Sequence, residues 1–522
     1  MTTLQIDLTP RQYHTAELLS DAVARKMGVS VDKIAHINPL RRSLDARRAI
    51  VYHTTLEVWL EGEPYAPPVT ASRYRRCHDA PPIVIVGAGP AGLFAALRAL
   101  EVGLRPVIVE QGKPVEQRRT DIAAAARTAT VDPTSNWCFG EGGAGTFSDG
   151  KLYTRSTKRG DIGYVLRKLV EHGADSDILV DVHAHIGTDR LGAIISRIRD
   201  TITQHGGEYR FGTRVTDLYC PTPNVVAGVK DVNGNIHEGI AVVLATGHSS
   251  RGIYELFARN GWLIEAKPFA MGVRVEHPQR LINAIQYRLP RNEGEMAFLP
   301  PASYSIATQV GSHGVFSFCM CPGGCIVPAA TAEGEQVVNG MSNSRRSSPW
   351  ANSGIAVTIG PADVPCHDDP LALMRFQQQV EQAMFQAAGC RIDAPCQRLT
   401  DFCDRRASAS LNKSNYLGRC VNAPLHELLP QVIADNLRQA FRQFDSKMHG
   451  FLTAEASVLA VESRTSSPVR IPRGDDYQHP QLRHLYPCGE GAGYAGGITS
   501  SALDGVNAIN AICQYRNYEI TL

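Results

Sequence analysis

The chain has 522 residues, of which 43% are hydrophobic and 20% are charged. This length allows about two to four domains with large cores and excludes a small disulfide-stapled scaffold. The 46 glycines follow no period, which excludes a collagen repeat, and 53 basic against 51 acidic side chains give a net charge of +2. No overall field therefore favours a nucleic-acid or membrane partner.

The start of the chain and its cysteines predict a cytoplasmic protein. The first residues, MTTLQIDLTPRQYHTAELL, lack the apolar core and cleavage site of a secretory signal. No run of ~18 apolar residues is free of charges, glycine and proline, so we expect no transmembrane helix. The odd number of 13 cysteines fits reduced thiols better than a disulfide framework.

Residues 1–78 predict a small α+β domain, with an alternating start (LQIDL), a helical stretch (TAELLSDAVARKMG) and two strands around ARRAIVYHTTLEVWLEG. The segment EPYAPPVTASRYRRCHDAPP has the composition of a linker. Strand, glycine turn and helix alternate over 79–266 and return over 455–522, so these two parts predict one domain. Between them, 267–454 mixes strand-like runs (FAMGVRVEH, GVFSFCMC, GIAVTIG) with the helical LRQAFRQF and predicts an inserted substrate domain.

A dinucleotide-binding turn is predicted between the strand Ile83–Val86 and the helix Ala91–Leu100. Three glycines, at positions 87, 89 and 92, give the pattern G-x-G-x-x-G, and Glu110 closes the next strand. Gly87 allows the tight turn, Gly89 lets the main chain touch a pyrophosphate, and Gly92 lets helix and strand pack closely. Glu110 would accept hydrogen bonds from ribose hydroxyls. The alternative is a purely structural glycine turn.

The C-terminal segment favours FAD over NAD. It reads YPCGEGAGYAGGITSSALDGVNAINAI, a strand with an acidic group, Glu490, at its end, then a glycine turn and a helix. That order suits a carboxylate beside the ribityl hydroxyls and a helix N-terminus facing the flavin, where negative charge collects on reduction. As an isolated segment it could also be a simple turn.

A third glycine-rich run, FGEGGAGTFSDGKL from Phe139 to Leu152, can hardly be a regular helix or strand. It predicts a loop along the cofactor, and a flexible surface loop is the alternative. The candidate cofactor-binding residues are Gly87, Gly89, Pro90, Ala91, Gly92, Glu110, Gln111, Arg118, Gly142, Gly143, Thr146, Ser148, Asp149, Lys151, Gly247, Gly489, Glu490, Gly497, Ile498 and Thr499.

Taken together, these segments resemble the bacterial FAD-dependent dehydrogenases of unassigned substrate, which are related to glutathione-reductase-like flavoproteins. The resemblance rests on IVIVGAGPAGLFAAL, FGEGGAGTFSDGKL, HIGTDRL, GVRVEHPQ, FCMCPGG, VNGMS, ESRTSSPVR and YPCGEGAGYAGGITSSALDG, and in the amino-terminal domain on RRSLDAR. It implies an α/β fold, with a Rossmann-like FAD-binding domain, an inserted α+β substrate domain and a small N-terminal α+β domain. SNYLGR and Cys325 depart from the family pattern, so the resemblance implies no substrate.

Three cysteines within seven residues, Cys319, Cys321 and Cys325, form a C-x-C-x3-C run. A metal site would need a fourth ligand, and a redox dithiol would resemble the disulfide reductases, whose cysteines follow the first βαβ unit closely. We favour a turn that lines the flavin face, with Cys321 near the substrate, and expect no metal. His185 and His277 are candidate bases, with structural hydrogen bonds as the alternative.

Three arginines, Arg274, Arg464 and Arg470, could bind a carboxylate substrate or hold the domains together through ion pairs. The run RRSLDARR could contact RNA, although a solvated or interdomain face is favoured, because no aromatic residues interleave it.

The sequence thus predicts an FAD-dependent oxidoreductase that transfers a hydride through flavin N5 to or from an unidentified small molecule. No second G-x-G-x-x-G follows a strand, so NAD(P)H would act only as a transient electron donor. The alternative is a flavin-containing redox sensor or binding protein, associated with RNA through the N-terminal domain. Neither a stable nucleic-acid partner nor a membrane partner is expected, and the oligomeric state is open.

Overall fold

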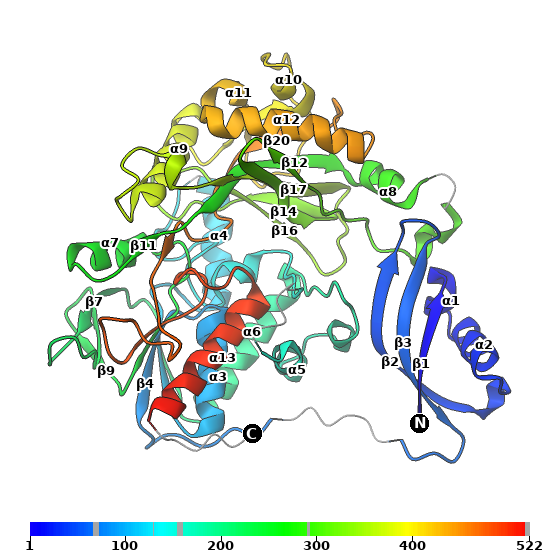
Figure 1. Cartoon of the computed structure of the whole chain (residues 1–522), viewed down its shortest axis with the longest axis horizontal. Helices are drawn as coiled ribbons and strands as arrows, with labels where there is room; N and C mark the ends of the chain where they lie inside the picture. The colour runs from blue at the N-terminus through cyan, green and yellow to red at the C-terminus, as the bar shows by residue number, and fades with distance from the viewer. Residues whose placement is uncertain (66–71, 129, 154–159, 290–292, 517–522) are drawn as a thin grey trace.

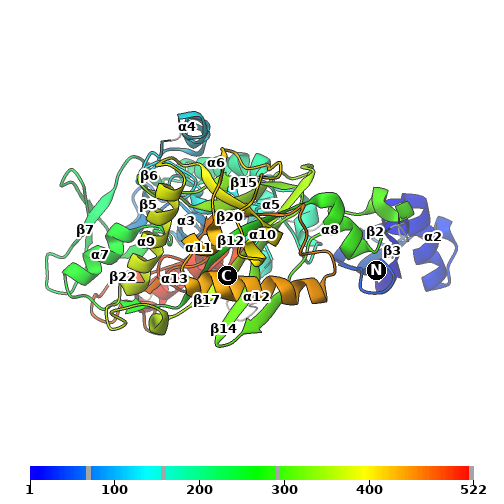
Figure 2. The same cartoon turned by 90° about the horizontal axis from the view of Figure 1, so that it is seen from above.

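The computed structural model describes all residues except 66–71, 129, 154–159, 290–292 and 517–522. Three sheets organise the molecule (Figure 1). The seven-stranded sheet lies above the parallel sheet in this view, and the N-terminal sheet lies to the side. Seen from above, the N-terminal unit lies at one extremity of an elongated molecule (Figure 2). No helix of the described part is long and apolar enough to cross a membrane.

The N-terminal sheet is antiparallel, in the order β1-β3-β2. Its strands are β1 (Thr2–Leu8), β2 (Ile34–Asp45) and β3 (Val51–Leu60), and its helices are α1 (Pro10–His14), α2 (Ala16–Met27) and the 3₁₀ turn η1 (Val31–Lys33). β3 alternates buried and less buried side chains, so one face packs on α2 around Val23, Leu56 and Val58. The RRSLDARR run begins on the long strand β2, which the sequence pattern did not predict.

The parallel sheet has the strand order β22-β10-β4-β5-β6. Its strands come from distant parts of the chain: β4 (Pro82–Val86), β5 (Arg105–Val109), β6 (Glu208–Arg210), β10 (Val242–Leu244) and β22 (Leu485–Pro487). The apolar runs of β4 and β5 are buried almost throughout, as expected of strands covered on both faces. The C-terminal segment therefore returns to the first βαβ unit, next to β10.

Two helices from the opposite ends of this unit pack closely together: α3 (Pro90–Val102) and α13 (Ile498–Tyr515), side by side in Figure 1. A Cβ on Gly505 would lie 2.0 Å from the carbonyl oxygen of Ala91. Only glycine permits this approach, which brings the start of α13 beside the turn that precedes α3. The helices α4 (Val115–Thr128), α5 (Ile162–Glu171) and α6 (Thr188–Gln204) and the 3₁₀ turns η2 (Gly143–Phe147) and η3 (Ser176–Leu179) lie between β5 and β6 in the chain.

The seven-stranded sheet has the order β13-β14-β17-β12-β20-β18-β19 and is antiparallel except for the β18–β19 pair. Helix α12 (Gln431–Lys447) covers one face, and its buried Phe441 and Phe444 join the core of the sheet (Figure 1). The strands are β12 (Phe269–Pro278), β13 (Ala307–Val310), β14 (His313–Cys321), β17 (Trp350–Ile359), β18 (Ala394–Arg398), β19 (Cys420–Asn422) and β20 (Ser457–Glu462).

Shorter elements connect the sheets. Three small strand groups are β7 (Val215–Tyr219), β8 (Gly228–Asp231) with β9 (Ile236–Glu238); β11 (Glu265–Ala266) with β21 (Val469–Arg470); and β15 (Gly324–Pro328) with β16 (Val338–Ser342). The remaining helices are α7 (Arg251–Arg259), α8 (Gln279–Tyr287), η4 (Glu293–Phe298), η5 (Pro361–Asp363), α9 (Ala372–Ala387), α10 (Leu399–Cys403) and α11 (Leu425–Leu428).

The predicted linker needs a correction over its second half. Residues 66–71 lie outside the described part, but the segment after them packs on the parallel-sheet unit. Cys77 is buried and its amide donates to the carbonyl of His205, while the Ser72 hydroxyl donates to Glu171. The polar and proline-rich composition therefore indicates irregular structure, but the second half of the segment is fixed by contacts with the parallel-sheet unit.

Candidate functional site

A cavity of about 630 Å³ lies between the parallel sheet and the strands β14 and β16. This volume falls within the usual range of cofactor and ligand sites. Four separated segments of the parallel-sheet unit contribute to its wall: the turn after β4, the glycine-rich loop 138–151, the loop after β10, and the segment that leads into α13. Among the predicted residues, Gly87, Gly89, Pro90, Ala91, Glu110, Gln111, Gly143, Ser148, Asp149, Lys151, Gly247, Gly489, Glu490, Gly497 and Ile498 line it.

The turn between β4 and α3 has the shape of a phosphate-binding turn. Gly87 has φ +107°, in the region that favours glycine, and Gly89 is the N-cap of α3, with Pro90 as the first helical residue. The free amides at this helix start and the positive end of its dipole lie at the cavity wall. Gly92 lies away from the cavity and allows the turn to close over the helix, since a Cβ there would lie 1.9 Å from the Gly87 oxygen.

Glu110 organises the backbone around this turn. Its Oε2 accepts from the amide of Ala88 at 2.8 Å, and its Oε1 accepts from Gly112 at 2.9 Å and Gly140 at 3.1 Å. The side chain is 5% exposed and borders the cavity. One carboxylate thus joins the phosphate turn to the glycine-rich loop, and a ribose hydroxyl would have to share oxygens that already accept amides.

Every residue of the glycine-rich loop 139–152 is buried or half-buried, so the alternative of a surface loop is wrong. Arg118 on α4 is fully buried beneath it and donates to the carbonyls of Glu141 at 2.5 Å, Asn136 at 2.8 Å and Gly143 at 3.1 Å. Burial lowers the pKa of Arg118 to about 10. This arginine holds the loop from behind and does not line the cavity, which corrects its assignment as a cofactor ligand. Gly142 and Thr146 also lie outside the lining.

The C-terminal segment contributes Glu490 and the start of α13. The Asp504 carboxylate accepts from the amide of Gly489 at 2.7 Å and pairs with Arg473 at 2.6 Å, which fixes the turn before the helix. Gly497 and Ile498 line the cavity, but Thr499 is buried and its hydroxyl donates to the carbonyl of Leu152 at 2.8 Å. Sequence reasoning missed Asp504 and Arg473, because their spacing of 31 residues carries no motif.

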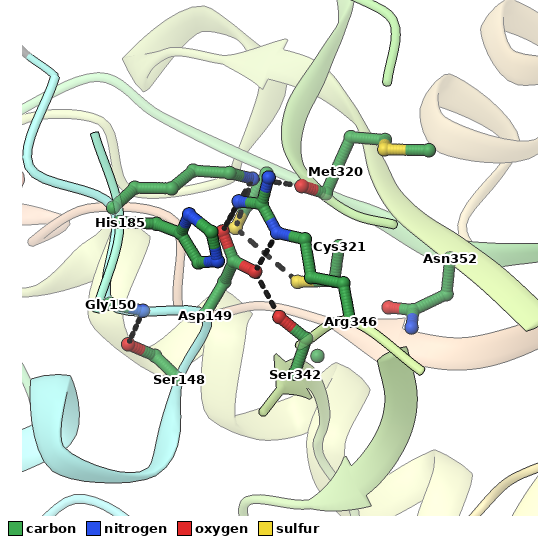
Figure 3. A network of polar contacts seen from close by, with 12 residues as sticks. Ser148, Asp149, Gly150, His185, Met320, Cys321, Ser342, Arg346 and Asn352 are labelled. Carbon is green, nitrogen blue, oxygen red and sulfur yellow. Dashed lines mark hydrogen bonds and ion pairs between the residues drawn. The ribbon is translucent and has the colours of Figure 1, made fainter. Parts of the chain in front are cut away.

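At the other end of the cavity, Lys151 and Cys319 meet across the boundary between the two sheets. The Lys151 ammonium donates to the carbonyl of Met320 and lies 3.6 Å from the Cys319 sulfur. Figure 3 shows the polar network around Asp149, which pairs with Arg346 at 2.7 Å and accepts a hydrogen bond from the Ser342 hydroxyl. Burial disfavours the charge of Lys151, yet Cys319, Cys321 and Asp149 raise its pKa. A cation is therefore held at this corner.

Of the three cysteines in the C-x-C-x3-C run, Cys319 borders the cavity, and not Cys321 as predicted. Cys319 belongs to the lining, while Cys321 is 0% exposed behind it, and their sulfurs are 4.0 Å apart. Both lie on strand β14, so the predicted turn begins only at Pro322. A bulge where β14 pairs with β17, between Ser317 and Cys319, sets which sulfur faces the cavity, and spacing alone does not reveal it.

Neither candidate histidine borders the cavity. His277 is fully buried in the core of the seven-stranded sheet, its Nε2 lies 2.8 Å from the carbonyl of Phe451, and burial lowers its pKa to about 4. His185 lies beside Asp149 in Figure 3, with Nε2 3.2 Å from the carbonyl of Ser344, and burial followed by Arg346 lowers its pKa. The role of His277 as a catalytic base is therefore corrected to a structural one.

Of the three predicted substrate arginines, only Arg464 lines the cavity. It pairs with Glu381 at 3.0 Å, and its Nε and Nη1 are buried without a partner among the described residues. Arg274 is fully buried and pairs with Glu462, donating also to Asn339 at 2.8 Å and Asn352 at 3.0 Å. Arg470 lies outside the lining, with its guanidinium 5.6 Å from the centre of the Tyr494 ring. Arg274 and Arg470 are thus structural.

The loop after β10 adds residues that the sequence did not indicate. His248 lines the cavity, with Nδ1 3.3 Å from a carboxylate oxygen of Glu490, and its Nε2 has no partner in the part of the chain that the structure describes. Arg251 pairs with Glu381 at 2.6 Å beside the same wall. These residues follow the strand IAVVLATG, whose buried pattern and terminal glycine were the available signal.

The donor set of this cavity fits FAD. Four features lie on one continuous wall. They are the phosphate-binding turn at the start of α3, the acidic residue at the end of β5, the start of α13, and the Nε2 of His248, which has no partner among the described residues. Among the described residues, no cluster of three His, Cys, Asp or Glu side chains could hold a metal ion.

Family models agree with this assignment. Residues 82–136 match the family model of an FAD binding domain, residues 268–465 match that of the FAD-dependent protein, C-terminal domain-like, and residues 1–59 match a domain of unknown function (DUF8436). A flavocytochrome c3 fumarate reductase in its open conformation is 12% identical, with 84% of this chain and 78% of that chain covered and a TM-score of 0.36. CtdE in complex with FAD is 11% identical, with 83% and 84% covered and a TM-score of 0.31.

The fold, the cavity and the two FAD-related family models define an FAD-dependent oxidoreductase, with FAD as its cofactor. The chain belongs to the same family as an uncharacterized protein of Clostridium beijerinckii, to which it is 36% identical over 518 residues, covering 95% of this chain and 96% of that one. The predicted resemblance to FAD-dependent proteins of unassigned substrate is confirmed.

Proposed function

We propose that the protein transfers a hydride between flavin N5 and a small molecule that binds at the Lys151 corner of the cavity. This proposal depends on one observation: two parts of the protein form the cavity wall. The phosphate turn and α13 belong to the parallel-sheet unit, whereas Phe318, Cys319 and Asn339 come from β14 and β16. Flavin enzymes commonly bind the cofactor in one unit and cover its ring with another.

Lys151 supports the chemistry of such a transfer. Its side chain is 36% exposed, and its ammonium lies against Asp149 at 3.9 Å and Cys319 at 3.6 Å. A fixed ammonium stabilises negative charge that develops on a substrate oxygen, or moves a proton to it, as hydride leaves or arrives. FAD supplies the hydride acceptor or donor, and this chain supplies the charge beside it.

The electron donor follows from the same architecture. In the described part of the chain the G-x-G-x-x-G run at Gly87–Gly92 directly follows a strand and opens a helix, whereas the runs at Gly140–Gly145 and Gly491–Gly496 do not directly follow one. We therefore propose that NAD(P)H, where it reduces the flavin, visits the cavity transiently. All thirteen cysteines are described and form no disulfide, which supports our proposal of a reducing compartment such as the cytoplasm.

The test is anaerobic bleaching of the yellow holoprotein. NADH, NADPH and a panel of small alcohols, hydroxy acids and amines are added one at a time, and the flavin absorbance is followed. At least one should bleach the wild type rapidly, and Lys151→Met should slow that reaction by about 100-fold, with Lys151→Arg much less affected. Bleaching at equal rates in Lys151→Met would contradict the assigned role. If the reduced protein fails to turn over after an electron acceptor is added, a sensor is favoured.

A further inference from the structure

The Cys319 and Cys321 side chains form a close pair that the hydride transfer does not use. They lie two residues apart on β14 and point to the same side of the strand, with their sulfurs 4.0 Å apart. A disulfide has an S–S bond of about 2.05 Å, so closing this one needs a movement of about 2 Å. Cys319 itself flanks the bulge of the β14–β17 ladder, which lies between Ser317 and Cys319.

One cationic side chain lies close to each sulfur. The Lys151 ammonium lies 3.6 Å from the Cys319 sulfur, and the Arg274 guanidinium lies 4.0 Å from the Cys321 sulfur. The contact with Cys321, followed by Lys151 and Arg274, lowers the pKa of Cys319 well below that of a free thiol, although burial opposes this; the pKa of Cys321 is raised. One thiolate beside one thiol is the state that disulfide exchange requires.

The two cysteines also differ in access. Cys319 belongs to the cavity wall, together with Phe318, Asn339 and Gly340, whereas Cys321 is completely buried behind it. Figure 3 shows Cys321 between the Asp149–Arg346 ion pair and Asn352. An attacking sulfur at the cavity with a resolving sulfur behind it is the arrangement of a redox-active pair. Cys325, on the next strand, is not part of it: burial raises its pKa to about 11.

We propose that Cys319 and Cys321 are a second redox centre, a dithiol that closes reversibly to a disulfide and exchanges an electron pair with the flavin. In the forward direction the Cys319 thiolate and the Cys321 thiol lose two electrons and the one thiol proton as the S–S bond forms. Both electrons and this proton pass to the oxidised flavin, which becomes the reduced anion. In the reverse direction the reduced flavin breaks the S–S bond and regenerates the dithiol. The proposal rests on the bound FAD but not on any particular substrate.

The first test counts thiols in the full-length holoprotein. After treatment with diamide and blocking with iodoacetamide in denaturant, trypsin releases the peptide 292–345, which contains Cys319, Cys321 and Cys325 and no internal Lys or Arg. We expect the mass of this peptide to show one alkylated cysteine and the loss of two hydrogens that accompanies one disulfide bond. In Cys325→Ser the peptide should carry no alkyl group, which assigns the bond. Two or more alkylated cysteines in the wild type would overturn the proposal.

The second test is an anaerobic dithionite titration of the same diamide-treated holoprotein. The wild type should consume two electron pairs per FAD, and Cys319→Ser and Cys321→Ser should each consume one. Cys403→Ser, which removes another buried thiol, should still consume two. If the wild type consumes only one electron pair per FAD, the dithiol proposal is refuted and the proposed hydride transfer is unaffected. If the wild type consumes two electron pairs per FAD but no small molecule bleaches the flavin, the proposed function is wrong and the dithiol proposal is supported.

Discussion

The carbonyl oxygen of Gly87 lies against the α-carbon of Gly92, so that a Cβ at position 92 would be 1.9 Å from it. This contact closes the phosphate turn on the first turn of α3. Gly92→Ala should destabilise the parallel-sheet unit by about 3 kcal/mol, because main-chain atoms of the turn must move. Unfolding by denaturant, followed by circular dichroism, would measure the loss.

Gly89 offers the matched comparison, because it has room for a side chain. Its φ is −76°, and a Cβ there would meet only the Gly143 α-carbon, at 3.9 Å. Gly89→Val should therefore fold with near wild-type stability but lose its yellow colour, since the side chain enters the wall where a pyrophosphate binds. If Gly89→Val retained FAD on gel filtration, the phosphate turn would be assigned wrongly.

Arg118 is predicted to control FAD affinity without touching the cavity. Its guanidinium satisfies carbonyls of the loop whose residues Gly140, Gly143 and Gly145 line the site. Arg118→Met should leave these buried carbonyls unpaired, cost on the order of 3 kcal/mol of unfolding free energy, and weaken FAD binding at least tenfold. Fluorescence titration of the apoprotein with FAD measures the second effect. Equal affinities in the variant and the wild type would show that the loop holds its shape without this arginine.

The sequence predicted the elements that local pattern determines. The apolar runs and glycine spacing predicted β4 and α3 to within two residues at each end and the end of β5 to within one, because buried parallel strands and their turns are encoded locally. The pattern did not distinguish Arg118 beneath the loop from a cofactor ligand, or Cys319 from Cys321. These assignments depend on which side of a helix or bulged strand faces the cavity, and tertiary packing decides that.

The N-terminal sheet is held to the parallel-sheet unit by β2. The Arg42 amide donates to the carbonyl of Val180, and its guanidinium pairs with Asp181 at 2.6 Å while lying over the Tyr13 ring at 4.7 Å. This agrees with the interdomain role that was favoured for RRSLDARR. A double-mutant cycle of Arg42→Met and Asp181→Asn should give a coupling of about 1 kcal/mol in thermal unfolding. Additive effects would show that the ion pair does not couple the units.

The buried His277 should make the seven-stranded sheet sensitive to acid. Burial lowers its pKa to about 4 in the folded protein, against 6.5 for a free histidine. Between these values the unfolded chain binds a proton that the folded chain excludes, so stability is present above about pH 6.5 and is lost as the pH falls toward 4. This difference corresponds to on the order of 3 kcal/mol.

His277→Gln should flatten the pH dependence of the unfolding free energy over that range, whereas the same change at His367, whose side chain is 69% exposed, should leave it unchanged. Equal slopes in His277→Gln and the wild type would mean that His277 is not the group that excludes the proton.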